Sequence, residues 1–262
     1  MAAHSKTSPD HVEMELDIVG TEAIRDPHGY FGRLREISPV LWDTRSRSWI
    51  VTGYSEITAA LRNDKDFSSD RIRPFIEKKL GGPDTNPKVR QAFEVLANWL
   101  VFNDKPKHLR LRTLINQAFM SKAMARLATR FQALFDEVIA SAPEAGDIDL
   151  LKSVTIPFSA SVISEMLGVP PEDRARFEDW HRLFGPIIGA SLDDRSKYDM
   201  LAEGVSELTA YVRQLMIRYR ADPQDNLLSE LLKARDDADA LSEDKVIATC
   251  TLVLFAGSET TA

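Results

Sequence analysis

Residues 252–262 read LVLFAGSETTA and close the sequence. They continue an apolar run, because the twelve residues from Val246 to Gly257 carry no charge. Such a run is too short to cross a bilayer and is typical of a buried helix. Glu259 and Thr260 follow at once, and a carboxylate without a partner is costly to bury. Either the helix ends at the surface here, or the polar pair is placed in the interior for chemistry.

The composition is that of an ordinary globular protein, with 262 residues, 44% hydrophobic and 28% charged residues and a net charge of −7. The N-terminus lacks the apolar segment of a signal peptide, and no stretch has the length of a membrane span. A single cysteine, Cys250, excludes an internal disulfide and a zinc site of several thiolates. We therefore expect a cytoplasmic protein with no membrane or nucleic-acid partner and no metal-ligating set of its own.

Positive charge gathers in one part of the chain, here called the basic segment, residues 104–130. It holds seven Lys or Arg residues and one acid, Asp104, so its net charge is about +6 and that of the remainder about −13. Two interpretations stay open for it. It is either a solvated basic helix face or a docking site for an anionic partner.

Hydrophobic periodicity predicts a mainly α-helical protein with a small β-sheet near the N-terminus. VLWD and SWIVT, on either side of TRSR (44–47), are expected to form a hairpin. Residues 64–92 are expected to be irregular, because GGPDTNP is a loop signal. Residues 150–184 are expected to contain an apolar helix that is kinked near Pro157 and stops at Gly168. No internal boundary is evident, so residues 1–262 are expected to form one domain.

The segment KHLRLRTLINQAF, residues 107–119, predicts a helix with one apolar stripe. The stripe consists of Leu111, Leu114, Ile115, Ala118 and Phe119. His108 and Arg112 are four residues apart at its edge, whereas Arg110 is expected to point away. A His and an Arg so placed can together hold a partly buried anion, because both donate hydrogen bonds. They can equally be a pair at the rim that extends into water.

Four stretches together resemble the cytochrome P450 family, in its soluble bacterial form. FAGSETTA (255–262) is similar to the family's central oxygen-binding helix, with its A/G-G-x-D/E-T-T pattern. DKPKHLRLRTLINQAFMSKAMARL (104–127) resembles the helix with the H-x-x-x-R pattern. The stretch from 26 to 63 is similar to the family's N-terminal helix and hairpin, and DNLLSELLKA (225–234) to the helix before the central one. Their order and spacing agree with the family.

The resemblance implies a haem b cofactor and the residues that would hold it. His108 and Arg112 would bind the haem propionates. Ala256 and Gly257 would lie over the distal face of the haem, where small residues leave room for dioxygen.

The resemblance also implies a catalytic acid–alcohol pair, Glu259 and Thr260. Thr260 would hydrogen-bond at the oxygen-activating site, and Glu259 would relay protons from solvent. The alternative for Glu259 is a solvated helix end.

One departure from the family's pattern is large. The family requires a proximal cysteine thiolate downstream of the central helix, and an E-x-x-R helix between the two. Neither occurs in these 262 residues. Cys250 lies in the body of the central helix itself and is expected to be a small buried hydrophobe. We therefore expect an incomplete cytochrome P450 fold, truncated within the central helix and without the C-terminal haem-thiolate portion.

As a complete protein, the family member would be a monooxygenase that hydroxylates or epoxidises an apolar small molecule with O2. Its electrons would come from a ferredoxin-type donor docked on the basic segment. The alternative is a truncated, haem-free helical fragment that at most binds a partner, and the chain alone is expected to be inactive. An apolar substrate pocket is expected from Phe75, Trp99, Phe184, Ile187 and Ile188, with further contacts near Ser191, Leu254 and Phe255.

Overall fold

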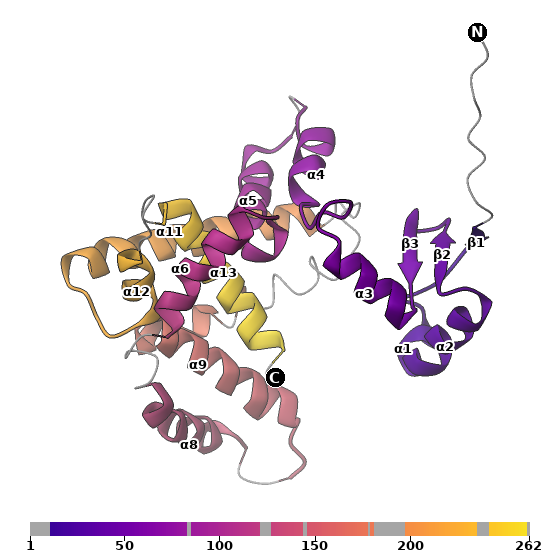
Figure 1. Cartoon of the computed structure of the whole chain (residues 1–262). Coiled ribbons are helices and arrows are strands. Elements are labelled where there is room, and N and C mark those ends of the chain that lie inside the picture. Colours follow the sequence, from indigo (N-terminus) through magenta and orange to yellow (C-terminus); the bar gives the residue numbers. More distant parts are fainter. Residues whose placement is uncertain are drawn as a thin grey trace. The chain divides into compact units, whose positions relative to one another are not determined.

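The computed structural model describes residues 11–82, 85–120, 127–143, 146–177, 179–180, 197–234 and 241–260. Contacts along the chain divide it into two compact units, Met1–Ser68 and Ser69–Ala262. Each unit is described by itself, and Figure 1 labels their elements. The expectation of one domain over the whole chain stays a prediction.

The first unit contains a three-stranded sheet of order β1-β2-β3. Its elements are β1 (Val12–Met14), α1 (Thr21–Arg25), α2 (Pro27–Ile37), β2 (Val40–Asp43), β3 (Ser48–Val51) and α3 (Tyr54–Arg62). Strands β2 and β3 are antiparallel, which confirms the predicted hairpin. Strand β1, which runs parallel to β2, was not predicted from the sequence. Leu16, Leu34 and Leu41 form the small core of this unit.

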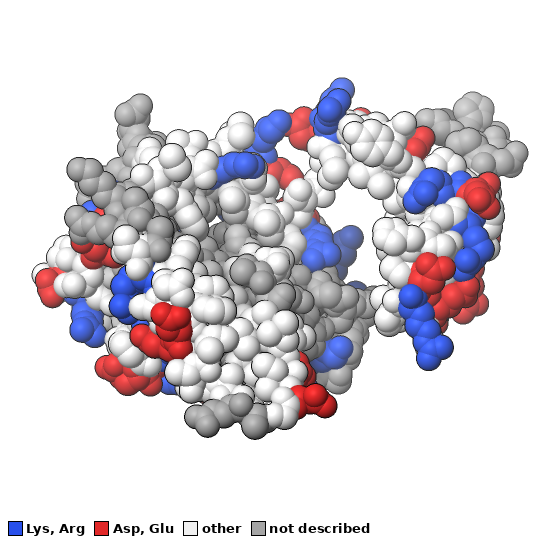
Figure 2. Space-filling model, turned by 90° about the horizontal axis from the view of Figure 1, so that it is seen from below, with Lys and Arg blue, Asp and Glu red and all other residues white. Residues whose placement is uncertain are grey.

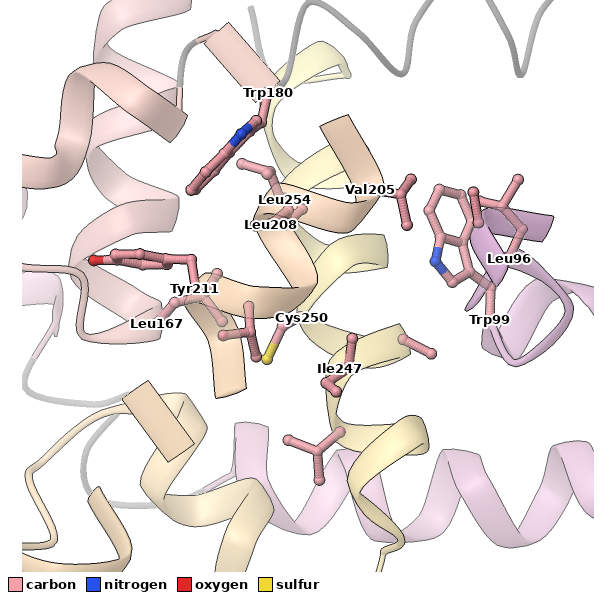
Figure 3. Packing of buried hydrophobic residues seen from close by; sticks show 14 of the residues in the cluster. Leu96, Trp99, Leu167, Trp180, Val205, Leu208, Tyr211, Ile247, Cys250 and Leu254 are labelled. Carbon is pink, nitrogen blue, oxygen red and sulfur yellow. The ribbon is translucent and has the colours of Figure 1, made fainter. Parts of the chain in front are cut away.

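The second unit is helical and holds the main core. Its elements are α4 (Ile72–Lys79), α5 (Pro87–Ala97), η1 (Leu100–Phe102), α6 (Lys107–Phe119), η2 (Ala128–Arg130), α8 (Phe131–Ser141), η3 (Leu151–Thr155), α9 (Ile156–Leu167), η4 (Pro171–Asp173), α11 (Tyr198–Ala221), α12 (Leu227–Lys233) and α13 (Glu243–Glu259). Helix α11 packs on α5, α13 packs on α9, and α12 packs on both α6 and α13. Figure 3 shows part of the hydrophobic core that these contacts enclose.

Local sequence accounts for the bounds of α9. Gly168 ends this helix in the left-handed conformation, with φ of 80°, which is readily available to glycine. The expected kink near Pro157 takes a different form. Residues Leu151–Thr155 make a π-helical turn, and α9 starts at Ile156 with Pro157 in its first turn. Proline has no N–H to donate to a carbonyl of the preceding turn, and the regular α-helix accordingly starts only after the π-helical turn.

The expectation of irregular structure over residues 64–92 is wrong in part, because α4 and the start of α5 lie within it. Helix α4 forms because Ile72 and Ile76, four residues apart, are both buried in the core. Helix α5 begins at Pro87, and Asn86 caps it by accepting a hydrogen bond of 3.0 Å from the Lys88 amide.

Candidate functional site

Helix α6 carries the predicted anion-binding pair. Leu111, Leu114 and Ile115 are buried, as the stripe predicts, and so is Ala118. The fifth member, Phe119, was expected in the core and is 37% exposed. The reason is its place at the last residue of the helix, beside Met120, which is also exposed. The buried face of α6 therefore ends at Ala118, one residue earlier than expected.

The structure places His108 at a half-buried position and Arg112 at an exposed one. Neither side chain makes a hydrogen bond or an ion pair with another described residue. Arg110, which was expected to point away, is half-buried and interacts with its surroundings. The two arginines thus differ in the described structure. Arg112 offers its full set of donors to a ligand, whereas Arg110 is already engaged in the fold.

Helix α13 changes its environment along its length. Residues 246–251 and Leu254 are buried, whereas Gly257 is half-buried and Ala256 and Thr260 are exposed. Ala256 in the last turn of α13 and Thr260, which caps the helix, are therefore at accessible positions. Of Glu259 the structure describes the backbone, as the last residue of the helix, and its side chain lies outside the described part.

A hydrogen bond joins two of the predicted residues in this last turn. The Thr260 hydroxyl donates to the carbonyl oxygen of Ala256 at 2.6 Å. Its proton is thereby committed to the helix, while its oxygen lone pairs remain able to accept a hydrogen bond. Hydroxyl bonds to the carbonyl four residues earlier tend to bend helices. The geometry makes Thr260 an acceptor for a water or ligand at the end of α13.

The structure gives a packing reason for glycine at 257. A Cβ added there would come within 2.3 Å of the Cδ1 atom and 3.0 Å of the Cγ1 atom of Ile163. Ile163 lies on α9 and is buried, so it has little room to withdraw. Gly257 thus permits the close approach of α13 and α9. This contact was not foreseen from the sequence, where the glycine was assigned to the dioxygen pocket.

Cys250 is a free, buried thiol in the body of α13, as expected from the sequence. Burial raises its pKa to about 12, so the thiol stays neutral at ordinary pH. Figure 3 shows it among the buried hydrophobic side chains of the core. It does not fit the role of an exposed thiolate ligand. Within the described ranges, no group of three or more His, Cys, Asp or Glu side chains is arranged to hold a metal ion.

The predicted substrate contacts fall into three groups. Trp99 and Leu254 are fully buried in the core. Phe75 and Phe255 are partly buried against the same core. The remaining ones, Phe184, Ile187, Ile188 and Ser191, lie outside the described residues. A cavity of about 140 Å³ lies elsewhere, between α5, α11 and α13, and polar side chains such as Asn98, Thr209 and Arg213 line it.

The basic segment is only partly a free surface. Arg130 forms an ion pair with Glu165 at 3.2 Å, and Lys122 and Arg126 lie outside the described residues. Lys107 is half-buried, and burial together with the nearby charges of Arg73 and Lys245 lowers its pKa. On the face shown in Figure 2, Lys and Arg side chains occur in separate groups among acidic and uncharged ones.

In the part of the chain that the structure describes, no helix combines the length and apolarity that a membrane span needs.

Comparison with known proteins identifies relatives of one kind. The chain is 29% identical over 94% of its length to cytochrome P450 CYP107DY1 of Priestia megaterium, of which it covers 61%. It is 31% identical over 90% of its length to the cyclomarin C epoxidase CymV of Salinispora arenicola, of which it covers 57%. The solved structure of cytochrome P450 CYP109Q5 from Chondromyces apiculatus matches 94% of the chain with a TM-score of 0.75 at 27% identity, and 58% of that protein is covered.

The chain spans less than two thirds of the length of each of these relatives. No protein-family model matches it. These relatives include an epoxidase and hydroxylases, so the family is one of monooxygenases.

Proposed function

Because this chain belongs with the bacterial cytochromes P450 and matches the N-terminal part of their fold, we propose that it serves in a haem-dependent monooxygenase. A protein that joins it to the remainder of the fold would hydroxylate or epoxidise an apolar small molecule with O2 and electrons from a redox partner. The observation that carries the proposal is the end of α13. There the exposed Ala256 and Thr260 of the motif FAGSETT are linked by a hydrogen bond, in a chain whose relatives are monooxygenases.

The donors on α6 fit a haem with two carboxylates. Arg112 is exposed and unengaged by described residues, and His108, one turn away, is half-buried. Arginine binds carboxylates through two parallel hydrogen bonds, and the imidazole adds another donor. We propose haem b as the cofactor, with these two residues on its propionates. When bound, the haem supplies an iron that activates dioxygen. Cys250 would not be its ligand, because the thiol is buried and neutral.

The last turn of α13 would position a water that receives protons, and its small residues would leave space beside that water. Thr260, whose hydroxyl proton is held by the Ala256 carbonyl, would accept a hydrogen bond from a water and so fix its position. Ala256 presents a small side chain at an exposed position, and Gly257 keeps the helix close to α9. Glu259 would exchange protons with solvent and pass them to that water, acting as a general acid.

Electrons would reach the protein through the basic segment. We propose a ferredoxin-type donor, an acidic protein, docked near Lys105 and Lys107, in the cytoplasm. The Lys107 ammonium is disfavoured by burial and by neighbouring positive charges, and an acidic partner would relieve that repulsion. Opposite charge on the two surfaces chiefly raises the association rate.

Carbon monoxide binding to the reduced protein tests the proposal. The gene would be expressed once as these 262 residues and once with any coding sequence that follows in frame, each with haem supplied. The longer product is expected to show the absorption band typical of thiolate ligation, and the 262 residues alone are not. Cys250→Ala serves as the control and should leave the band of the longer product unchanged. A thiolate band from the 262 residues that Cys250→Ala abolishes would overturn the assignment of Cys250.

The alternative, a haem-free helical fragment with a partner-binding role, predicts that neither product retains haem. That outcome would overturn the monooxygenase proposal.

A further inference from the structure

Trp99 makes a buried polar contact with the central helix. Its indole N–H donates a hydrogen bond of 2.8 Å to the Thr251 hydroxyl, and that hydroxyl donates at 2.9 Å to the Ala248 carbonyl. Trp99 is 1% exposed and Thr251 is fully buried. Leaving a buried indole N–H without a partner is costly. This hydrogen bond is therefore favourable, and it also fixes the position of Trp99 relative to Thr251.

The same indole also contacts the next turn of α13. It stacks on Phe255 with ring centroids 5.6 Å apart, and on Phe102 with ring centroids 6.1 Å apart. Thr251 and Phe255 are four residues apart and therefore neighbours on one helix face. Contacts at two successive turns, one polar and one aromatic, fix both the rotation of α13 and its position along its axis. Figure 3 shows Trp99 beside Leu96 at the end of α5.

The backbone around Trp99 is itself held in place. The side-chain amide of the buried Asn103 donates to the Trp99 carbonyl, and Arg73 donates at 2.8 Å to the Ala97 carbonyl. Arg73 is in turn paired with Asp70 at 2.6 Å. Residues 97–103 are thus a braced segment, and α6, with its candidate propionate donors, begins four residues after it.

On α9, a second contact limits the end of α13. Gly257 lies so close to Ile163 that no Cβ could be added without movement. The turn that contains Ala256 and Thr260 therefore follows directly on the Trp99 contacts and is bounded by α9.

From these contacts we propose that Trp99 is a positioning residue for the reaction, acting through Thr251 and Phe255 on the Ala256–Thr260 hydrogen bond. The inference rests on the proposed function, because it holds that the packing of Trp99 affects proton delivery in the proposed reaction. Trp99 does not touch the reacting atoms. It holds the helix register that places the Thr260 hydroxyl, and it ties that register to the segment leading into α6.

Two variants separate the polar contact from the bulk of the ring. Trp99→Phe keeps an aromatic ring for the stack and removes the donor. Thr251→Val keeps the shape of the side chain and removes the acceptor. The matched control is Trp180→Phe, because Trp180 is a buried indole in the same core whose N–H donates to Glu207 on α11, at 3.2 Å. The control loses an indole hydrogen bond to a residue of α11 and keeps both contacts of Trp99 with α13.

Amide hydrogen exchange of the 262-residue chain is the first measurement, and it needs no haem. Trp99→Phe and Thr251→Val are expected to speed exchange of the amides of residues 256–260 roughly 2- to 10-fold, the range for one lost hydrogen bond. Trp180→Phe should leave these amides unchanged. The double variant should add little to either single one, since both remove the same bond. Equal acceleration in the control would overturn the proposal.

The second measurement is coupling in the haem-loaded, active protein. Trp99→Phe is expected to divert reducing equivalents to hydrogen peroxide, as Thr260→Ala should, with haem content unchanged and Trp180→Phe unaffected. Wild-type coupling in an active Trp99→Phe enzyme would overturn the positioning role and leave the monooxygenase proposal standing. An inactive wild-type protein would overturn the proposed function instead, and with it the positioning role.

Discussion

The Thr260 hydroxyl donates its proton to the Ala256 carbonyl across 2.6 Å, within the last turn of α13. This bond orients the hydroxyl, so that its lone pairs are its remaining hydrogen-bonding capacity. It also occupies the Ala256 carbonyl, so the backbone hydrogen bond that this carbonyl would otherwise accept within the helix is weakened. Two residues of the motif are thus coupled, and a change at position 260 acts at position 256 as well.

Thr260→Ala is expected to lower coupling in the active enzyme. The variant loses the acceptor that would hold the water, so dioxygen should still be consumed while product falls and hydrogen peroxide rises. The measurement is the ratio of product and peroxide to reducing equivalents used. Thr260→Ser is the control, because it keeps the hydroxyl and should retain most of the coupling. Equal coupling in the alanine and serine variants would contradict the assigned role.

Arg112→Ala and His108→Ala are expected to weaken haem retention. For Arg112 the loss of a charge-assisted contact that haem would bury corresponds to about 1.5–3 kcal/mol, or roughly 10- to 100-fold faster haem loss. Transfer of haem to an excess of a haem-scavenging apoprotein measures the rate.

Arg110→Ala provides the comparison on the same helix. Arg110 is half-buried and already engaged, so its loss should lower the unfolding temperature with little direct effect on haem. Equal haem loss from the Arg110 and Arg112 variants, at equal stability, would refute the assignment of the pair.

Cys250 should make the stability of the chain sensitive to alkaline pH. Its pKa is raised from 9.0 to about 12 in the folded state, so the folded thiol stays protonated while the unfolded one ionises. The contribution of this neutral, buried thiol to the free energy of unfolding is therefore fully present below pH 9 and is lost as the pH rises toward 12. Between pH 8 and 10 the free energy of unfolding should fall about 1.4 kcal/mol more in the wild type than in Cys250→Ala. Identical pH profiles by urea unfolding would show that the thiol is not buried as described.

Much of the fold follows from local signals in the sequence. The hairpin at β2 and β3 follows from alternation around a polar turn, and the end of α9 follows from Gly168. The stripe of α6 is correct up to its last member, because i, i+4 spacing dictates which side chains share a face. These features depend on neighbours within a few residues, which the sequence displays directly.

Other features depend on partners far away in the chain. Helix α4 could not be predicted from its polar flanks, since the burial of Ile72 and Ile76 depends on the assembled core. The Trp99–Thr251 bond spans 152 residues, although a threonine inside an apolar helix already indicates a need for a partner. The close contact of Gly257 with Ile163 was equally invisible, because a glycine alone does not reveal what approaches it.

Neutralising Lys105 and Lys107 is expected to slow electron transfer from an acidic donor. The Lys105→Gln, Lys107→Gln variant should lose association rate at low salt and approach the wild type at high salt, because screening shortens the range of the charges. The change at Lys107 should not lower the free energy of unfolding, because burial and the charges of Arg73 and Lys245 already disfavour the Lys107 ammonium. Stopped-flow reduction at several ionic strengths measures the effect.

Lys152→Gln is the matched control for that experiment. Lys152 lies outside the basic segment and pairs with Asp149 at 3.2 Å on an exposed surface. It should leave the reduction rate unchanged. If the double variant also keeps the wild-type rate at low salt, the basic segment is a solvated face and not a docking site.

Glu259→Gln is expected to slow turnover while leaving coupling largely intact. The substitution keeps the size of the side chain and removes the ionisable group, so the general acid is lost where proton delivery limits the rate. Such groups typically contribute ~10²–10⁴-fold. The variant should also show a solvent isotope effect that differs from that of the wild type, because proton transfer would take another route. Steady-state turnover in H2O and D2O measures both quantities.

Comparison with Thr260→Ala decides between proton relay and a solvated helix end. A relay predicts two separable effects, since the carboxyl supplies the proton and the hydroxyl holds the water that receives it. Loss of the carboxyl should then appear as a lower rate, and loss of the hydroxyl as peroxide formation. A solvated helix end predicts neither effect, because both side chains would simply face water. Wild-type rate and coupling in both variants would therefore leave the last turn of α13 with a structural role alone.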